Sequence, residues 1–261
     1  MSKPAIIAVV SLKGGVAKTT SAVNIAAGLA ESGKKTLLLD MDPQTGASLH
    51  LGYDLEDLEL TIADVLLYKD VLLNDVTIKT DKDNLFLVPS NENLTNIENE
   101  LEVEIGRENI LLEKLDGQID TYDFVVIDSP PIKSFLLFSI LKASNFVIVP
   151  FRTNSMSVVA TYQLVELMDK AKKRINQDIK ILGYFGTMFD QRTKESQKSL
   201  DEMREKFKEE VFKTVIPTTT VLAQAAREGT TAFDHARGSK GSISYKELVD
   251  EILIRIDGVL K

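Results

Sequence analysis

The segment at residues 11–20 reads Ser-Leu-Lys-Gly-Gly-Val-Ala-Lys-Thr-Thr and has the residue types of a phosphate-binding loop. Its glycine pair allows backbone N–H groups to turn toward an anion, and a helix that begins after the pair adds the positive end of its dipole. Lys18 supplies a positive charge for the β- and γ-phosphates, and the Thr19 hydroxyl can reach Mg²⁺. Leu12 and Ala17 stand where the general pattern G-x-x-x-x-G-K-[ST] has glycine.

Carboxylates follow two apolar runs of the sequence. Asp40 and Asp42 come after the run at 36–39, and Asp128 comes after the run at 124–127. The carboxyl ends of parallel strands lie beside the phosphate loop, where ligands bind in doubly wound folds. Asp128 fits the Walker B position, which holds Mg²⁺ directly or through water.

The phosphate loop and the carboxylates would be brought together by a parallel sheet, and the sequence has the hydrophobic pattern of such a sheet. Short apolar runs without strict alternation, typical of strands covered on both faces, lie at 5–10, 36–40, 85–89, 124–128, 146–150 and 179–188. Between the runs lie helical patterns, of which the clearest are Thr20–Ser32 and Val158–Ile175, and the polar, acidic segments 54–83 and 91–113 are also helix-like. Strands that alternate with helices predict an α/β fold, a doubly wound and mostly parallel sheet flanked by helices. No repeat or long linker interrupts residues 1–261, so we expect a single domain.

Amino-acid composition and charge exclude several classes of function. The chain has 261 residues, is 44% hydrophobic and contains no Cys, which excludes disulfides, thiolate metal sites, iron–sulfur ligation and a Cys nucleophile. The formal net charge is -8, but residues 1–130 carry 10 Lys and Arg against 23 Asp and Glu, whereas residues 131–261 carry 21 against 16. The basic half can therefore bind nucleic acid, although the net charge of the whole chain is unfavourable for such binding. We find no signal peptide or spanning segment and expect a cytoplasmic protein.

The segment Lys13–Thr20 resembles the deviant Walker A motif K-G-G-x-x-K-[ST] of the ParA/MinD family of ATPases. Further blocks at 40–44 (D-x-D-P-Q), 85–91, 122–131, 187–193 and 239–248 are similar to stretches of the same family, closest to its ParA-like branch. The resemblance covers nearly the whole chain. It implies a P-loop NTPase fold with ATP and Mg²⁺ as cofactors.

The resemblance also implies roles for individual residues. The nucleotide contacts are Lys13, Gly14, Gly15, Val16, Ala17, Lys18, Thr19 and Thr20, together with Met188, Pro217 and Thr219 on the adenine side. Lys13 is expected to reach across a dimer interface to the ATP of the partner subunit, so that Lys13, Lys18 and Asp42 form the catalytic set. Asp42 orients or activates the attacking water and Asp40 supports the magnesium shell, which gives a metal set of Thr19, Asp40, Asp42 and Asp128.

DNA contacts are expected in the basic half, with one departure from the family. Two arginines of the family motif I-P-R-N-V-R, which contribute to DNA binding in chromosomal members, are Thr218 and Val221 here. This chain must therefore bind DNA with other residues, or not bind it. The candidates among the basic residues of this half are Arg192, Lys194, Arg227, Arg237 and Lys240.

The best-supported function is an ATPase that dimerises with ATP, binds non-specific DNA and positions a cargo such as a plasmid, a chromosome region or a protein compartment like a carboxysome. Its partners are then itself, DNA and a ParB-like or other adaptor that stimulates hydrolysis, and we expect nucleoid association in the ATP-bound state. One alternative is a MinD-like membrane-positioning ATPase, but the amphipathic stretch Tyr245–Lys261 carries mixed charge and is expected to pack against the domain. Another alternative is a metabolic CobQ-type P-loop enzyme.

Overall fold

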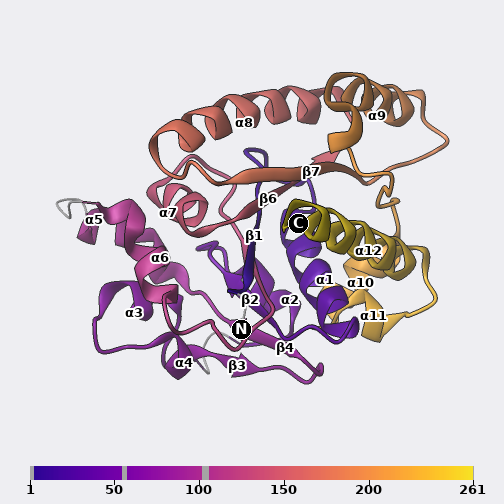
Figure 1. Ribbon diagram of the computed structural model, residues 1–261. Coiled ribbons are helices and arrows are strands. Elements are labelled where there is room, and N and C mark those ends of the chain that lie inside the picture. The colour runs from indigo at the N-terminus through magenta and orange to yellow at the C-terminus, as the bar shows by residue number, and fades with distance from the viewer. Residues whose placement is uncertain (1–2, 55–57, 102–105, 261) are drawn as a thin grey trace.

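The computed structural model describes residues 3–54, 58–101 and 106–260 (Figure 1). Within these residues seven strands form one sheet in the order β3-β4-β2-β5-β1-β6-β7. The pairings are parallel except that β3 runs antiparallel to β4. The strand bounds are β1 Ala5–Val9, β2 Thr36–Asp40, β3 Ile78–Lys79, β4 Leu85–Val88, β5 Phe124–Asp128, β6 Phe146–Arg152 and β7 Lys180–Thr187. The predicted doubly wound, mostly parallel sheet is confirmed, and the six predicted runs are its parallel strands.

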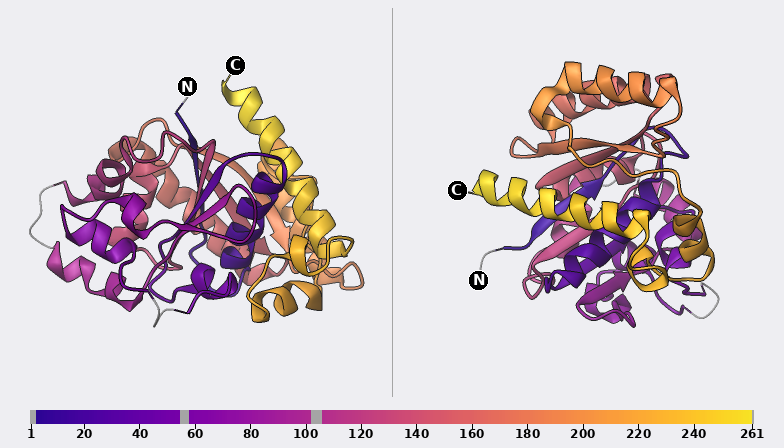
Figure 2. Two further views of the ribbon diagram at one scale, coloured as in Figure 1. Left: turned by 90° about the horizontal axis from the view of Figure 1, so that it is seen from below. Right: turned by 90° about the vertical axis from the view of Figure 1, so that its right-hand side faces the viewer.

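Helices cover both faces of the sheet (Figures 1 and 2). Their bounds are α1 Lys18–Glu31, α2 Gly46–His50, α3 Ile62–Leu67, α4 Leu73–Val76, α5 Ile97–Glu100, α6 Ile110–Leu115, α7 Phe135–Ala143, α8 Ser155–Arg174, α9 Lys194–Phe207, α10 Thr220–Arg227, α11 Ala232–His235 and α12 Lys240–Leu260. One core lies under α3, α6, α7, α8 and α9, and the other lies under α1, α11 and α12. The acidic segments predicted as helical contain only short helices, and residues 55–57 and 102–105 of those segments lie outside the described residues.

The central strand β1 explains why its sequence is apolar without alternation. Ile6 and Ala8 point into one core while Ile7 and Val9 point into the other, and all four side chains are buried. A strand that is covered on both faces must be hydrophobic at every position. The register aligns Val9 with Asp128, and Asp40 with Asp128 across β2 and β5. The sheet therefore delivers the phosphate loop and the predicted carboxylates to one edge.

Helix α12 packs on the domain as predicted for the C-terminal amphipathic stretch. Tyr245, Leu248 and Ile252 are fully buried, and the Tyr245 hydroxyl lies 2.9 Å from the Ser21 hydroxyl of α1. On the outer side Arg255 donates to backbone carbonyl groups, including that of Leu182 in β7 at 2.8 Å. The side of α12 that carries these three residues is therefore occupied within the molecule, whereas Ile254 is exposed. None of the described helices combines the length and the hydropathy that a membrane-spanning helix requires.

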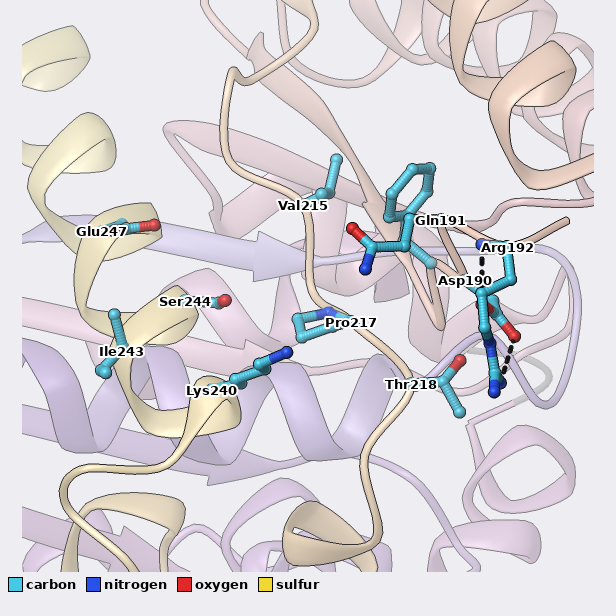
Figure 3. Close-up of a pocket in the computed structure, with 11 residues that line it drawn as sticks. Asp190, Gln191, Arg192, Val215, Pro217, Thr218, Lys240, Ile243, Ser244 and Glu247 are labelled. Carbon is cyan, nitrogen blue, oxygen red and sulfur yellow. Dashed lines mark hydrogen bonds and ion pairs between the residues drawn. The ribbon is translucent and has the colours of Figure 1, made fainter. Parts of the chain in front are cut away.

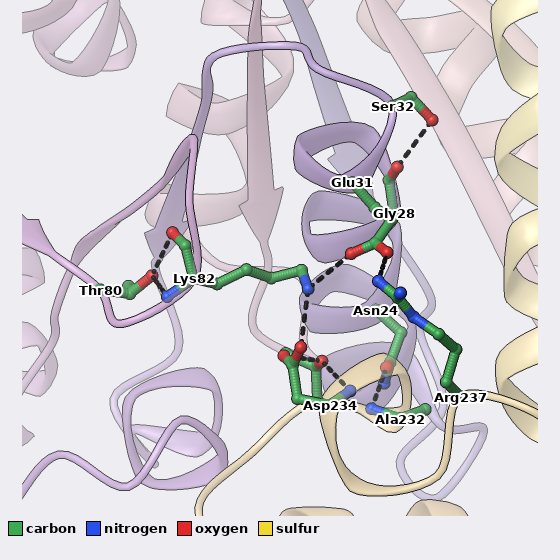
Figure 4. A network of polar contacts seen from close by, with 10 residues as sticks. Asn24, Gly28, Glu31, Ser32, Thr80, Lys82, Ala232, Asp234 and Arg237 are labelled. Carbon is green, nitrogen blue, oxygen red and sulfur yellow. Dashed lines mark hydrogen bonds and ion pairs between the residues drawn. The ribbon is translucent and has the colours of Figure 1, made fainter.

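A surface network joins the far end of α1 to the C-terminal segment (Figure 4). Lys82 lies 2.8 Å from Glu31 and 2.9 Å from Asp234, and Arg237 also pairs with Glu31. The backbone N–H of Ala232 donates to the Asn24 side chain at 2.9 Å. These contacts fix α11 on α1 and thereby orient the segment that leads into α12.

Candidate nucleotide site

The phosphate loop lies between β1 and α1, as predicted. Gly15 has φ +71° and Ala17 has φ 61°, so both adopt the left-handed conformation. An alanine is strained there because its Cβ approaches the following carbonyl, whereas a glycine is not. The Thr187 hydroxyl, at the end of β7, donates to the carbonyl of Val16 at 3.0 Å and thereby links the loop to β7.

Lys18, the first residue of α1, is held by two carboxylates. Its Nζ lies 2.9 Å from Oδ1 of Asp128 and 3.7 Å from Oδ2 of Asp42. The lysine side chain is 7% exposed and Asp128 is fully buried. The structure thus brings together three of the predicted site residues, and it places the positive charge next to the strand-end carboxylates.

Asp128 has the features expected of a metal-binding carboxylate. Burial raises the pKa of Asp128, and this effect is opposed by the charge of Lys18 and by hydrogen bonds from Thr19 and Lys18. Among the described residues no hydrogen-bond partner reaches its second oxygen, Oδ2, although that atom is buried. A buried, unpartnered carboxylate oxygen close to a threonine hydroxyl fits the preference of Mg²⁺ for oxygen ligands. The residues present therefore fit the metal.

Asp40 is fully buried and makes its contacts with the protein. Its Oδ2 accepts hydrogen bonds from the backbone N–H of Ser48 at 2.9 Å and from the Ser48 hydroxyl at 2.8 Å, and its Oδ1 accepts one from the N–H of Asp42 at 3.3 Å. Burial, followed by repulsion from Asp128, raises the pKa of Asp40 to about 7. Its contribution to the Mg²⁺ shell stays a prediction.

Asp42 lies at the start of a tight segment that leads into α2. Its Oδ1 accepts a hydrogen bond from the N–H of Gln44 at 3.0 Å, and Thr45 follows in the left-handed conformation with φ 58°. Gly46 then lies against Thr19, since a Cβ on Gly46 would be 3.1 Å from the Thr19 methyl group. The segment after β2 is therefore packed directly on the threonine of the phosphate loop.

Lys13 lies at the rim of the site and does not contact Lys18 or the carboxylates. Its Nζ lies 3.4 Å from the Ser157 hydroxyl in the first turn of α8. On the same helix Met156 is 72% exposed and Val159 is 56% exposed, and Ile132, in the loop after β5, is 62% exposed. Large apolar side chains thus face solvent on the elements that flank this lysine.

The predicted adenine residues lie at the ends of β7 and of the segment before α10. Pro217 lines a cavity of about 460 Å³ together with Phe189 and Thr218 (Figure 3). Met188, next to Phe189 in the chain, has φ 50°. The Thr219 side chain instead caps α10 by accepting a hydrogen bond from the N–H of Val221 at 3.3 Å.

The predicted DNA contacts fall into two groups. Arg192 and Lys240 line the cavity beside Pro217, and Arg192 forms a bidentate pair with Asp190 at 2.8 and 2.9 Å (Figure 3). That pair lowers the pKa of Asp190 to about 2. Lys194 is exposed at the start of α9, whereas Arg227 ends α10 and Arg237 pairs with Glu31 on the α1 side.

The structure adds site residues that sequence reasoning did not single out. Ser48 and Ser90 are buried: the Ser48 hydroxyl donates to the Asp40 carboxylate, and the Ser90 hydroxyl donates to the backbone carbonyl of Asp42. Thr187 supports the phosphate loop. Ser90 and Thr187 stand inside blocks that resemble the family, yet neither spacing nor residue type indicates which hydroxyl is turned inward.

Comparisons with known proteins agree with this geometry. A family model described as an AAA domain matches residues 4–181. The chromosome-partitioning ATPase Soj of Treponema pallidum is 36% identical over 247 residues, which cover 94% of this chain and 96% of that protein. The chromosome partitioning protein ParA of Myxococcus xanthus is 34% identical over 250 residues, which cover 96% of this chain and 88% of that protein.

A solved structure is similar over nearly the same length. It is that of cobyrinic acid a,c-diamide synthase from Mycobacterium smegmatis with a bound ATP analog and magnesium. The TM-score is 0.86 at 33% identity, and the match covers 96% of this chain and 94% of that chain.

Proposed function

Because the chain belongs to the ParA/MinD family of P-loop ATPases, we propose that it positions or segregates a cargo by ATP-gated dimerisation and DNA binding. The cargo is a plasmid, a chromosome region or a protein compartment. A partner protein stimulates hydrolysis and thereby releases the ATPase from DNA. The relatives named for chromosome partitioning support this class of function.

The observation that carries the proposal is the buried cluster of Lys18, Asp42 and Asp128. Lys18 is available to the β- and γ-phosphates once these replace its carboxylate partners, because its ammonium is already at the phosphate loop. Thr19 and Asp128 are the residues that would hold Mg²⁺, which neutralises charge on the phosphates when bound. Asp42, released from Lys18, is then free to orient the attacking water.

The surroundings of Lys13 support the dimer. A charged side chain at the rim cannot reach phosphates bound to its own loop while it donates to Ser157, but it can turn toward a second copy that approaches this face. Ile132, Met156 and Val159 supply exposed apolar area on the same side of the site. Burying such side chains is the usual driving force for protein association.

DNA binding rests on the basic half of the chain. Arg192 and Lys240 line one cavity, Lys194 is exposed at the start of α9, and Arg227 and Arg237 lie on the α10–α11 side. Thr218 replaces a basic residue of the family motif at this same cavity, so the flanking cations would carry the contact with phosphates. We propose that the dimer associates with the nucleoid through these residues.

The test is binding to random-sequence duplex DNA with ATP, ADP or no nucleotide across a salt series. We expect DNA binding with ATP but not with ADP or without nucleotide. The DNA affinity should fall steeply as the salt concentration rises, because each phosphate contact releases a counterion. Replacing Arg192 and Lys240 by Ala should weaken binding, whereas replacing the exposed Lys34 should not. Absence of ATP-dependent binding at low salt would contradict the proposal.

A metabolic enzyme of CobQ type is the second candidate, and the similar structure of cobyrinic acid a,c-diamide synthase favours it. The DNA experiment separates these two candidates, since ATP-dependent DNA binding is expected of the positioning ATPase and not of the metabolic enzyme. The MinD-like alternative is less favoured because α12 packs on the domain through Tyr245, Leu248 and Ile252.

A further inference from the structure

A closed ring of hydrogen bonds surrounds the backbone of Asp42. The N–H of Asp42 donates to Oδ1 of Asp40 at 3.3 Å, and Oδ2 of Asp40 accepts from the Ser48 hydroxyl at 2.8 Å. The Ser48 hydroxyl in turn accepts from the N–H of Ser90 at 3.3 Å, and the Ser90 hydroxyl donates to the carbonyl of Asp42 at 2.9 Å. Asp40, Ser48 and Ser90 are fully buried and Asp42 is 7% exposed.

The ring fixes both backbone polar groups of Asp42 from opposite sides. Its N–H is held by Asp40, on β2, and its carbonyl is held by Ser90, which follows β4. Strands β2 and β4 are neighbours in the sheet, so these anchors come from the rigid part of the fold. The Asp42 carbonyl also accepts from the N–H of Thr45 at 2.8 Å, which links the same atom to the turn before α2.

The backbone around Ser90 is also held by hydrogen bonds. The carbonyl of Pro89 accepts a hydrogen bond from the N–H of Ile62 at 2.9 Å, at the start of α3. Ser90 therefore has its backbone held by α3 on one side and by Ser48 on the other. A buried hydroxyl with a fixed backbone and a single described acceptor, the Asp42 carbonyl, defines where that carbonyl lies.

We propose that Ser90 is a positioning residue for ATP hydrolysis, whose hydroxyl sets the backbone of Asp42 and thereby the direction of its carboxylate. The inference rests on the role proposed above for Asp42. Ser90 acts through Asp42 and does not touch the nucleotide, so its removal lowers turnover and leaves nucleotide affinity unchanged. A shift of a catalytic group by about 1 Å costs on the order of a hundredfold in rate.

The test compares the kcat and KM for ATP of Ser90→Ala, Ser90→Thr and Ser144→Ala. Ser144 is the matched control, because its buried hydroxyl also donates to a backbone carbonyl, that of Ile140 at 2.7 Å, at the end of α7. We expect Ser90→Ala to lower kcat about tenfold or more with ATP affinity within about twofold. Ser90→Thr, which keeps the hydroxyl, restores most of the rate, and Ser144→Ala leaves kcat within about twofold.

Ser48→Ala removes a different hydrogen bond of the same ring. It therefore tests the proposal even if Ser90→Ala does not fold. It is expected to lower kcat by a similar factor. If Ser90→Ala folds, the double variant is expected to be no slower than either single variant, because one ring is broken in each case. An unchanged kcat in Ser90→Ala, or an equal loss in Ser144→Ala, would overturn the proposal.

Asp42→Ala, measured alongside, separates this inference from the function on which it rests. If Asp42→Ala keeps its turnover, the role proposed for Asp42 is wrong. If Asp42→Ala loses turnover while Ser90→Ala keeps it, only the positioning role of Ser90 is wrong.

Discussion

The ammonium of Lys18 lies 2.9 Å from Oδ1 of Asp128, in a pair that is almost completely shielded from water. The lysine of the phosphate loop and the carboxylate at the end of β5 thus neutralise each other's charge. At the proposed nucleotide site the phosphates would compete for the same ammonium, and the carboxylate that they would displace is the one whose second oxygen has no partner among the described residues. We therefore expect phosphate binding to free Asp128, the predicted metal ligand, from this ion pair.

Lys18→Met is expected to abolish ATP binding and also to destabilise the protein without nucleotide. Removing one partner of a buried pair leaves the other charge uncompensated, which typically costs about 3–5 kcal/mol. Urea unfolding and nucleotide titration measure the two effects. Lys34→Met, at an exposed position, is the control, and an unfolding free energy equal to that of the control would show that the pair contributes nothing.

Ala17→Gly is expected to stabilise the protein by about 0.5–1 kcal/mol, because glycine adopts the left-handed conformation of this position without the Cβ clash. The matched change Ala27→Gly, in the buried interior of α1, is expected to destabilise it by about 1 kcal/mol or more. Urea unfolding of both variants checks the opposite signs. Destabilisation by Ala17→Gly would contradict the strain assigned to the loop.

Most of the strands and the residues at the centre of the candidate site could be predicted from the sequence, for physical reasons that particular residues illustrate. Apolar runs that end in Asp40 and Asp128 predict buried parallel strands, and parallel strands bring their carboxyl ends to one edge. The two-residue β3 and the capping role of Thr219 left no comparable pattern, because each depends on tertiary contacts. Likewise nothing in the local sequence shows that the Ser90 hydroxyl meets the carbonyl of Asp42.

His50 is expected to make the protein sensitive to mild acid. Burial lowers the pKa of His50 to about 4 from its ordinary 6.5, and no partner among the described residues reaches its Nε2. The unfolded chain takes up a proton below about pH 6.5 while the folded protein does not, so stability is present above pH 6.5 and is lost as the pH falls toward 4. The loss between pH 7 and pH 4.5 is about 2 kcal/mol.

Replacing His50 by Gln should flatten this pH dependence, as measured by urea unfolding at pH 7 and pH 4.5. His235→Gln is the control, because His235 pairs with Glu228 near the surface. A pH dependence that is the same in His50→Gln and in the native protein would rule out His50 as its source.

Lys13→Ala is expected to bind ATP but to lose ATP-dependent pairing of two copies. In this structure Lys13 donates to Ser157 of its own chain, and pairing requires it to turn toward the nucleotide of the partner. Nucleotide titration and sedimentation velocity measure the two properties separately, with Lys34→Ala as control. Unchanged pairing in Lys13→Ala would show that the lysine does not act across the interface.

The measurement that tests ATP-driven pairing most directly is the molar mass of Asp42→Ala in solution, with saturating Mg²⁺ and either ATP or ADP. This variant is expected to bind ATP without hydrolysing it, so the ATP-bound state persists during the measurement. We predict twice the chain mass of 28.9 kDa with ATP and the mass of one chain with ADP. A single-chain mass with ATP bound would contradict nucleotide-gated dimerisation.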